Sequence, residues 1–155
     1  MQRSPSLVIQ PNEGQAFWSP KPANSYIEIK VSLWDLGDTK HTVFLDEIPP
    51  GCHVGEHSHE QGTVEIFTVL SGQGEILLDD VVYPLQPETI MYVHNQSRHS
   101  IRNTGNIPLR FMVVTTPTGL EERFKAMGPV RTLGEEPPEP FTSYQPMDSH
   151  GVKKA

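Results

Sequence analysis

The chain has 155 residues, which is enough for one domain with a sizeable core. Its formal net charge of -7, from 12 Lys and Arg against 19 Asp and Glu, argues against nucleic acid or anionic membrane surfaces as partners. The single cysteine, Cys52, fits a reducing compartment, and nowhere are there about 18 consecutive apolar residues. We therefore expect a cytoplasmic protein that does not span a membrane.

Short alternating or apolar segments, separated by turn residues, recur along the chain. Strands are expected at residues 6–10, 26–33, 41–48, 63–70, 75–78, 81–85, 89–94 and 108–116. Every second residue from Ile27 to Leu33 is apolar, which is typical of a half-exposed strand. Asp79 and Asp80 predict a tight hairpin between two of the strands. Strands at such short intervals indicate an all-β sandwich or barrel.

Two segments lack this periodicity. Residues 11–25 predict an irregular, turn-rich stretch in which the adjacent Phe17 and Trp18 either seal the core or line a pocket or a dimer contact. From Gly134 onward the chain is rich in proline and glutamate. That composition predicts either a disordered tail or an extended arm that lies on a partner subunit.

Residues 117–127 change to a helical period. The apolar positions recur at four and three residues, at Leu120, Phe124 and Met127. Thr118 and Glu121 have the spacing of a capping box, and Gly128 with Pro129 predicts the end of the helix. We expect a short amphipathic helix that packs on the barrel.

The middle of the chain concentrates groups that bind metals. His57 and His59 are two residues apart, so in a strand their imidazoles point to the same face. Glu65 begins a run in which Phe67 and Val69 share its face; the residues between them are also mostly apolar, so we expect this strand to be buried on both faces. Because a buried carboxylate is costly unless it is paired or coordinated, Glu65 is predicted to be a ligand.

The order of these residues resembles the two sequence motifs of the cupin superfamily, over roughly residues 40 to 116. The first motif is carried by Gly51, His57, His59, Glu65 and Gly72, and the second by His99 and Asn103. Five residues separate His59 from Glu65, where the family usually has three or four, which predicts a bulge. In the second motif, Glu88, His94 and Gln96 stand where the family usually has Gly, Pro and Gly.

This resemblance implies a double-stranded β-helix, the jelly-roll barrel of the cupins, with one short C-terminal helix. We expect an N-terminal strand and irregular segment at 1–24, the barrel with its closing helix at 25–128, and a Pro/Glu-rich tail at 129–155. The length and the single HxH stretch exclude a two-barrel cupin. A homodimer is also expected, partly from the resemblance and partly because the two terminal segments could pair across subunits.

The resemblance also implies that His57, His59, Glu65 and His99 hold one divalent transition metal, which could be Fe, Mn, Ni, Co, Cu or Zn. Three imidazoles and one carboxylate leave one or two positions of an octahedral metal open to a substrate. His94 could replace His99 if the loop register shifts; otherwise His94 and His53 are expected beside the ligands and outside the ligand set. Strand histidines can also be simple hydrogen-bonded residues, so a metal-free barrel remains an alternative.

The residues predicted to line the cavity around the metal are Phe67, Val69, Tyr92 and Phe111. From the open ligand set and the resemblance, we expect an oxygenase or dioxygenase that acts on a small organic substrate, with Glu65 as the residue that takes a proton. The alternatives are an isomerase, cyclase or lyase that uses the same metal, and a barrel that binds a small molecule without chemistry.

Overall fold

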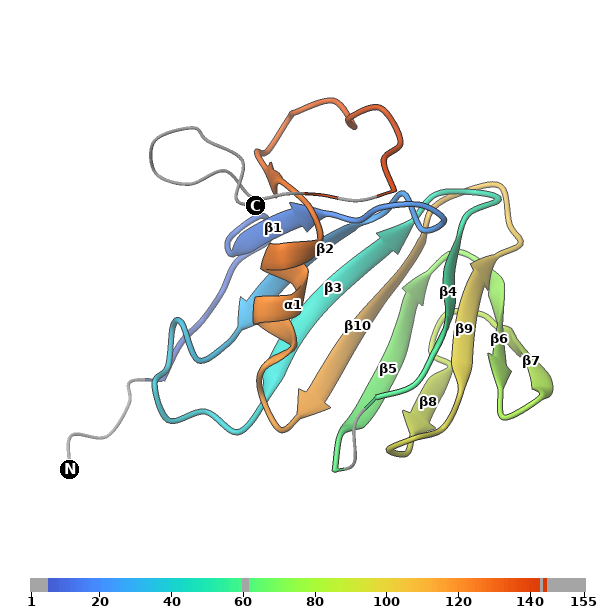
Figure 1. Ribbon diagram of the computed structural model, residues 1–155, viewed down its shortest axis with the longest axis horizontal. Coiled ribbons are helices and arrows are strands. Elements are labelled where there is room, and N and C mark those ends of the chain that lie inside the picture. Colours follow the sequence, from blue (N-terminus) through green and yellow to red (C-terminus); the bar gives the residue numbers. More distant parts are fainter. Residues whose placement is uncertain (1–5, 60–61, 143, 145–155) are drawn as a thin grey trace.

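A computed structural model describes residues 6–59, 62–142 and 144 of the chain. Two antiparallel sheets face each other and enclose the core (Figure 1). The larger sheet contains β11 (Val130–Arg131), β1 (Gln15–Trp18), β2 (Tyr26–Val31), β3 (Thr42–Ile48), β10 (Leu109–Thr116), β5 (Val64–Ser71) and β8 (Ile90–Val93), in that spatial order. The smaller sheet contains β4 (His53–His57), β9 (His99–Asn103), β6 (Gly74–Leu78) and β7 (Val81–Leu85). This is the expected jelly-roll barrel.

The core lies between the two sheets, and the strand alternation places it there. In β10, Leu109, Phe111 and Val113 point inward and are almost completely buried. The predicted hairpin is also confirmed, because β6 and β7 pair across Asp79 and Asp80, both of which have a positive φ. Positive φ at two central residues is the conformation that a two-residue hairpin requires.

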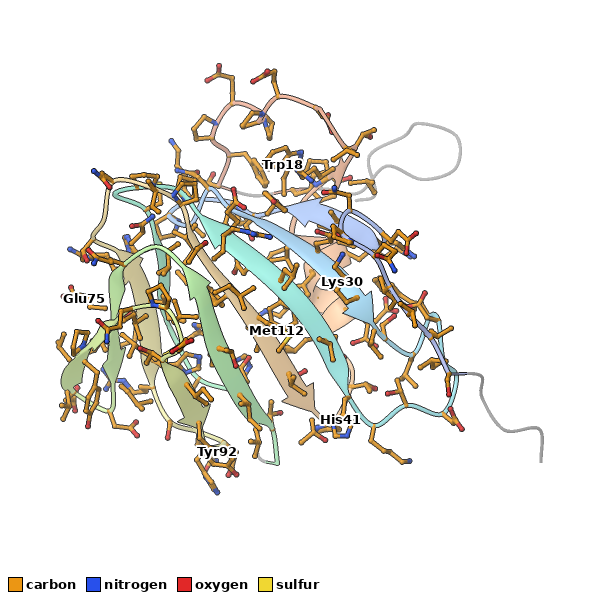
Figure 2. All side chains as sticks on the ribbon, turned by 180° about the vertical axis from the view of Figure 1, so that it is seen from behind. Trp18, Lys30, His41, Glu75, Tyr92 and Met112 are labelled. Carbon is orange, nitrogen blue, oxygen red and sulfur yellow. The ribbon has the colours of Figure 1, made fainter. Side chains whose placement is uncertain are left out.

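Only one face of β5 is buried, which corrects the expectation for this strand. Glu65, Phe67 and Val69 point into the barrel, whereas Ile66 and Leu70 on the opposite face are 40% and 44% exposed. The reason is that no element among the described residues covers the outer face of the larger sheet near its edge strand β8 (Figure 2). Apolar residues on both faces of a strand therefore did not indicate burial on both faces here.

The N-terminal region also differs from the expectation. The described residues of the segment 6–10 form no strand, and a strand instead covers Gln15–Trp18 inside the segment predicted to be irregular. This strand pairs with β2 on one side and with β11 on the other, so its backbone groups are satisfied by distant parts of the chain. Phe17 and Trp18 are buried, as a core-sealing pair would be.

The helix α1 (Leu120–Met127) packs over the opening between the sheets, with Leu120, Phe124 and Met127 against the core. The predicted capping box is wrong, because the residue at the N-cap position is Gly119, and no side-chain hydrogen bond caps the helix. Glu121 instead accepts hydrogen bonds from the backbone N–H of Leu33 and of Gly119 and from the hydroxyl of Thr42. Glu121 thus joins the helix to β3 through Thr42, in addition to its local contact with Gly119.

The segment after the helix returns to the first strands of the same chain. Val130 and Arg131 in β11 pair with Phe17 and Ala16 in β1, and the backbone N–H of Lys21 donates to the carbonyl of Phe141 at 2.8 Å. Residues 145–155, in the predicted tail, lie outside the described residues. The three-part division of the chain remains a prediction.

Candidate metal centre

Three histidines and one glutamate meet at one end of the barrel. His57 ends β4, His59 follows it, Glu65 lies at the start of β5 and His99 begins β9. His57 and His99 are opposite each other across the β4–β9 pair, after a register shift between Val54 and His57. One nitrogen from each of the three imidazoles lies within 4.8 Å of the others, a separation suited to a shared metal ion.

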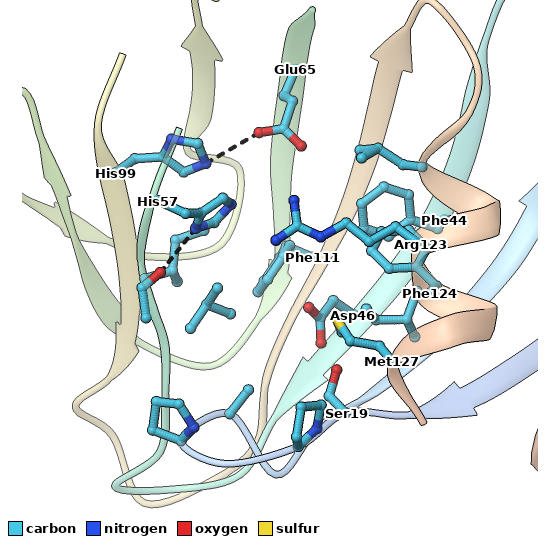
Figure 3. A pocket seen from close by; sticks show the side chains of 18 of the residues that line it. Ser19, Phe44, Asp46, His57, Glu65, His99, Phe111, Arg123, Phe124 and Met127 are labelled. Carbon is cyan, nitrogen blue, oxygen red and sulfur yellow. Dashed lines mark hydrogen bonds and ion pairs between the residues drawn. The ribbon is translucent and has the colours of Figure 1, made fainter. Parts of the chain in front are cut away.

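Glu65 faces the imidazoles directly. Its Oε2 lies 2.9 Å from Nε2 of His59 and 3.2 Å from Nε2 of His99, the contact marked in Figure 3. All three atoms are buried, yet none has a hydrogen-bond partner with acceptable geometry among the described residues. Three buried ligand atoms that converge without satisfying one another are what a metal ion would satisfy. The residues present therefore fit the metal that the sequence implies.

The backbone fixes the orientation of two of the rings. Nδ1 of His57 bonds to the carbonyl of Gly55 at 2.9 Å, and Nδ1 of His99 bonds to the carbonyl of Ser97 at 3.0 Å. A carbonyl can only accept, so each Nδ1 carries the proton and each Nε2 keeps its lone pair. This is the tautomer that an Nε2 metal ligand needs, held by the outer hydrogen bond typical of metal sites.

The charges of the cluster are set by burial and by the neighbouring groups. Burial alone would raise the pKa of Glu65, but His59 and His99 beside it lower the pKa to about 2. Burial lowers the pKa of His57. Burial opposes protonation of His99 as well, but Glu65 and the Ser97 carbonyl outweigh it and raise the pKa of that ring. Glu65 is thus a carboxylate at neutral pH, the form that binds a metal.

The cluster forms one wall of a cavity of about 340 Å³ between the two sheets. The cavity is closed on its far side by α1 and by the loop at residues 19–23, and its walls are mainly apolar. Four phenylalanines line it: Phe44, Phe67, Phe111 and Phe124. A mostly apolar cavity with a few convergent polar groups has the make-up of a small-molecule site.

A family model described as "Cupin domain" matches residues 44–115, the part of the chain that supplies the four clustered side chains. The chain belongs to the cupin superfamily. An oxalate-binding protein from Thermotoga maritima is 37% identical over 68 residues, which are 44% of this cupin and 55% of that protein. SchB from Streptomyces halstedii is 34% identical over 76 residues, 49% of this cupin and 54% of SchB. This cupin therefore spans about half the length of these curated relatives.

The solved structures agree on the fold. The crystal structure of a predicted oxalate decarboxylase from Thermotoga maritima has a TM-score of 0.62 at 25% identity, and the similarity covers 72% of this cupin and 99% of that chain. The polyketide cyclase RemF from Streptomyces resistomycificus has a TM-score of 0.64 at 18% identity and covers 84% and 87% of the two chains. The second likeness concerns the fold alone. No helix in the described part of this cupin is long and apolar enough to cross a bilayer.

The cavity contains some of the predicted lining residues and not others. Phe67 and Phe111 line it. Val69 is buried in the core but does not line the cavity. Tyr92 lies on the outer face of β8, opposite Ile66, and is 60% exposed, which corrects its prediction as a cavity residue. In this strand the alternation turns Met91 and Val93 inward, so Tyr92 must point outward.

The two additional histidines lie apart from the cluster. His53 does not line the cavity, because the register shift after Val54 breaks the parity that would align it with His57. His94 is exposed, with its ring against Tyr92 and its Nδ1 at 3.3 Å from the carbonyl of Asn95. The ring that joins the cluster is therefore that of His99 and not that of His94.

Four charged residues that line the cavity were not identified from the sequence: Lys21, Asp46, Glu56 and Arg123. Asp46 on β3 and Arg123 on α1 both line the cavity, and Figure 3 shows their side chains directed into it. The sequence could have identified Asp46, because in an alternating strand it shares the inward face with the apolar residues Phe44 and Ile48. Arg123 lies three residues after Leu120, on the helix face that we expected to pack on the barrel.

Proposed function

We propose that this cupin is a cytoplasmic metalloenzyme of the dioxygenase type that acts on a small organic substrate. The observation that carries the proposal is the convergence of His57, His59, His99 and Glu65 on one wall of the cavity. These residues would hold one divalent transition metal. When bound, such a metal supplies a Lewis acid for a substrate oxygen atom and, if it is redox-active, a partner for dioxygen. Because all four groups line the cavity, a substrate there would lie next to the metal.

The chain's own residues would select and position the substrate. The four phenylalanines favour an apolar body and exclude water from around it. Arg123 directs its guanidinium towards the cavity, where it suits a carboxylate or another oxygen-rich group. Glu65 remains our candidate for taking a proton from the substrate, through a carboxylate oxygen that is not engaged as a ligand.

Oxygen consumption tests the dioxygenase form of the proposal. Metal-loaded protein is incubated with a panel of small aromatic and enolisable compounds in an oxygen electrode, with the His57→Ala variant as the control. We expect stoichiometric oxygen uptake with at least one compound and none with the variant. Turnover that continues unchanged without oxygen would exclude a dioxygenase and favour an isomerase, cyclase or lyase that uses the same metal.

A second candidate function is binding without chemistry, favoured by the relative that is described as an oxalate-binding protein. Oxalate is a two-carbon dianion and suits the metal and Arg123, but it leaves the apolar walls unused. For this reason we place binding of oxalate second. Calorimetric titration of metal-loaded protein with oxalate, followed by recovery of unchanged oxalate, would support it. The absence of measurable heat at millimolar oxalate would exclude it.

We also propose that the chain forms a homodimer. Four large apolar side chains lie together on the uncovered outer face of β5 and β8: Ile66, Leu70, Ile90 and Tyr92. Contiguous apolar patches of this kind mark protein contacts more often than they mark free surface. Light scattering at micromolar concentration should give twice the chain mass. A monomer would contradict this proposal and would leave the metal site untouched.

A further inference from the structure

Asp46 occupies a position in the barrel where an apolar side chain would be expected. The inward face of β3 carries Phe44 and Ile48 on either side of it. Its neighbours across the sheet are Ile27 on β2 and Phe111 on β10, both buried. A carboxyl group in such a row costs free energy, since apolar neighbours replace none of the hydrogen bonds that it made to water.

The described part of the protein compensates this cost only in part. Asp46 is only 5% exposed, and its Oδ1 is buried without a hydrogen-bond partner among the described residues. In the same part of the chain no ion pair joins it to Arg123, although both side chains line the cavity. Burial raises the pKa of Asp46 to about 7, against the smaller opposing effects of Ser25 and of the Glu47 backbone.

Asp46 faces the same cavity as the histidine cluster, from a different wall. Figure 3 shows its carboxyl group beside Met127, across the cavity from His57 and His99. In this view Phe111 lies between the two polar groups, and the guanidinium of Arg123 also points into the space between them. A molecule in the cavity can therefore meet the cluster at one end and Asp46 at the other.

We propose that Asp46 is a specificity-determining residue that hydrogen-bonds a hydroxyl or amino hydrogen at the end of the substrate remote from the histidine cluster. This deepens the proposed function and rests on it only in that the ligand occupies the same cavity. The substrate class is a small molecule with a metal-binding oxygen at one end, an apolar body, and a hydrogen-bond donor at the other end. A ligand that lacks the donor would cover Asp46 with apolar atoms and leave it unsatisfied, which is how a buried polar group rejects an analogue.

A structural role for Asp46 makes a different prediction, which thermal denaturation tests without any ligand. The variants are Asp46→Asn, of the same shape, and Asp46→Leu, which removes the polar group. If Asp46 serves the ligand and not the fold, both variants should melt at pH 8 at or above the wild-type temperature. Glu121→Gln is the matched control, because Glu121 is a buried carboxylate with three hydrogen bonds, and it should melt lower. A clear fall in melting temperature for both Asp46 variants would overturn the proposal.

Matched pairs of small probes test the specificity itself. The probes are 3- and 4-hydroxybenzoate, each compared with the corresponding methylbenzoate, titrated calorimetrically into zinc-loaded protein. In the wild type at least one hydroxyl compound should bind roughly tenfold more tightly than its methyl partner, because the methyl group leaves the buried carboxyl without a hydrogen bond. In Asp46→Leu that preference should vanish or reverse. No preference in the wild type, or the same preference in both proteins, would overturn the proposal.

Metal analysis of the same samples separates this inference from the proposed function. A hydroxyl preference that depends on Asp46 in a protein that retains no metal would count against the metalloenzyme and in favour of the role of Asp46. Retained metal without a hydroxyl preference would count against Asp46 alone.

Discussion

Two buried carboxylates near strand β3 are in opposite circumstances: Glu121 of α1 lies beside one end of the strand, and Asp46 lies within the strand towards its other end. Near one end, the hydroxyl of Thr42 donates a hydrogen bond to Glu121 at 2.5 Å, and two backbone N–H groups donate to the same carboxylate. Near the other end, Asp46 on the same inward face has an oxygen with no partner among the described residues. Both side chains are buried. The difference teaches that burial alone does not separate a structural carboxylate from a functional one; the presence of a partner does.

Glu65 is a third case, and it explains why the comparison matters. It has close neighbours, as Glu121 has, but these are imidazole nitrogens that do not form proper hydrogen bonds with it. Glu121 is satisfied by the fold, Asp46 faces a cavity, and Glu65 belongs to a cluster of buried ligand atoms that converge without satisfying one another. Four predictions test whether these three circumstances are real.

The largest effect should come from filling the cluster around Glu65. Adding a divalent transition metal to metal-free protein, at about a thousandfold excess over Kd, contributes about 4 kcal/mol of stability. For a chain of this size that raises the melting temperature by roughly 10 °C. His57→Ala should lose the shift, and His94→Ala, which changes an exposed ring, should keep it. Absence of a shift in the wild type with each of the six candidate metals would contradict the assignment.

The next largest effect concerns the unsatisfied carboxyl. In the unfolded chain Asp46 loses its proton near its ordinary pKa of 3.8, but in the folded protein only near a pKa of about 7, so folding is penalised as the pH rises between these values. Asp46→Asn should therefore raise the free energy of unfolding by up to about 4 kcal/mol above pH 7 and by almost nothing below pH 4. Urea denaturation at several pH values measures this. A variant that is less stable than the wild type at pH 8 would contradict it.

The satisfied carboxylate should respond in the opposite direction. Glu121→Gln replaces an acceptor-only group with one that carries an NH₂, so at least one donor among Leu33, Thr42 and Gly119 loses its partner. We expect a loss of about 1–3 kcal/mol at neutral pH. These hydrogen bonds outweigh burial and lower the pKa of Glu121, so its contribution is present above the pKa of the unfolded chain and is lost as the pH falls through the folded value. If the loss of stability in Glu121→Gln became larger as the pH fell, this result would contradict the prediction.

The smallest effect should come from the outer face. Tyr92→Ser removes an exposed ring that faces neither the cavity nor the core, so the stability of the folded chain should change by less than about 0.5 kcal/mol. Metal content and ligand binding should not change either. Measurable loss of metal in this variant would mean that Tyr92 affects the metal site, and it would contradict the position of Tyr92 outside the cavity.

The sequence allowed the barrel and its cluster to be predicted because both depend on local patterns. The alternation in strands such as β10 sets the face that points inward. One glycine of the motif also has a local reason: Gly72 has a positive φ, and a Cβ at this position would lie 2.5 Å from the carbonyl oxygen of Pro108. Long-range pairing could not be read in the same way. The strand at Gln15–Trp18 exists because β2 and β11 flank it, and the bulge in β4 moved His53 out of line with His57. Asp46 could have been found, since its polar side chain breaks an apolar face.

The metal content per chain of untagged protein, purified without chelators and measured by inductively coupled plasma mass spectrometry, tests the central claim most directly. His57→Ala and His59→Ala are purified alongside the wild type. Our account predicts close to one transition metal ion per wild-type chain and its loss in both variants. Wild-type protein that holds no metal even after reconstitution, or variants that retain as much metal as the wild type, would contradict the assignment of this cluster as a metal centre.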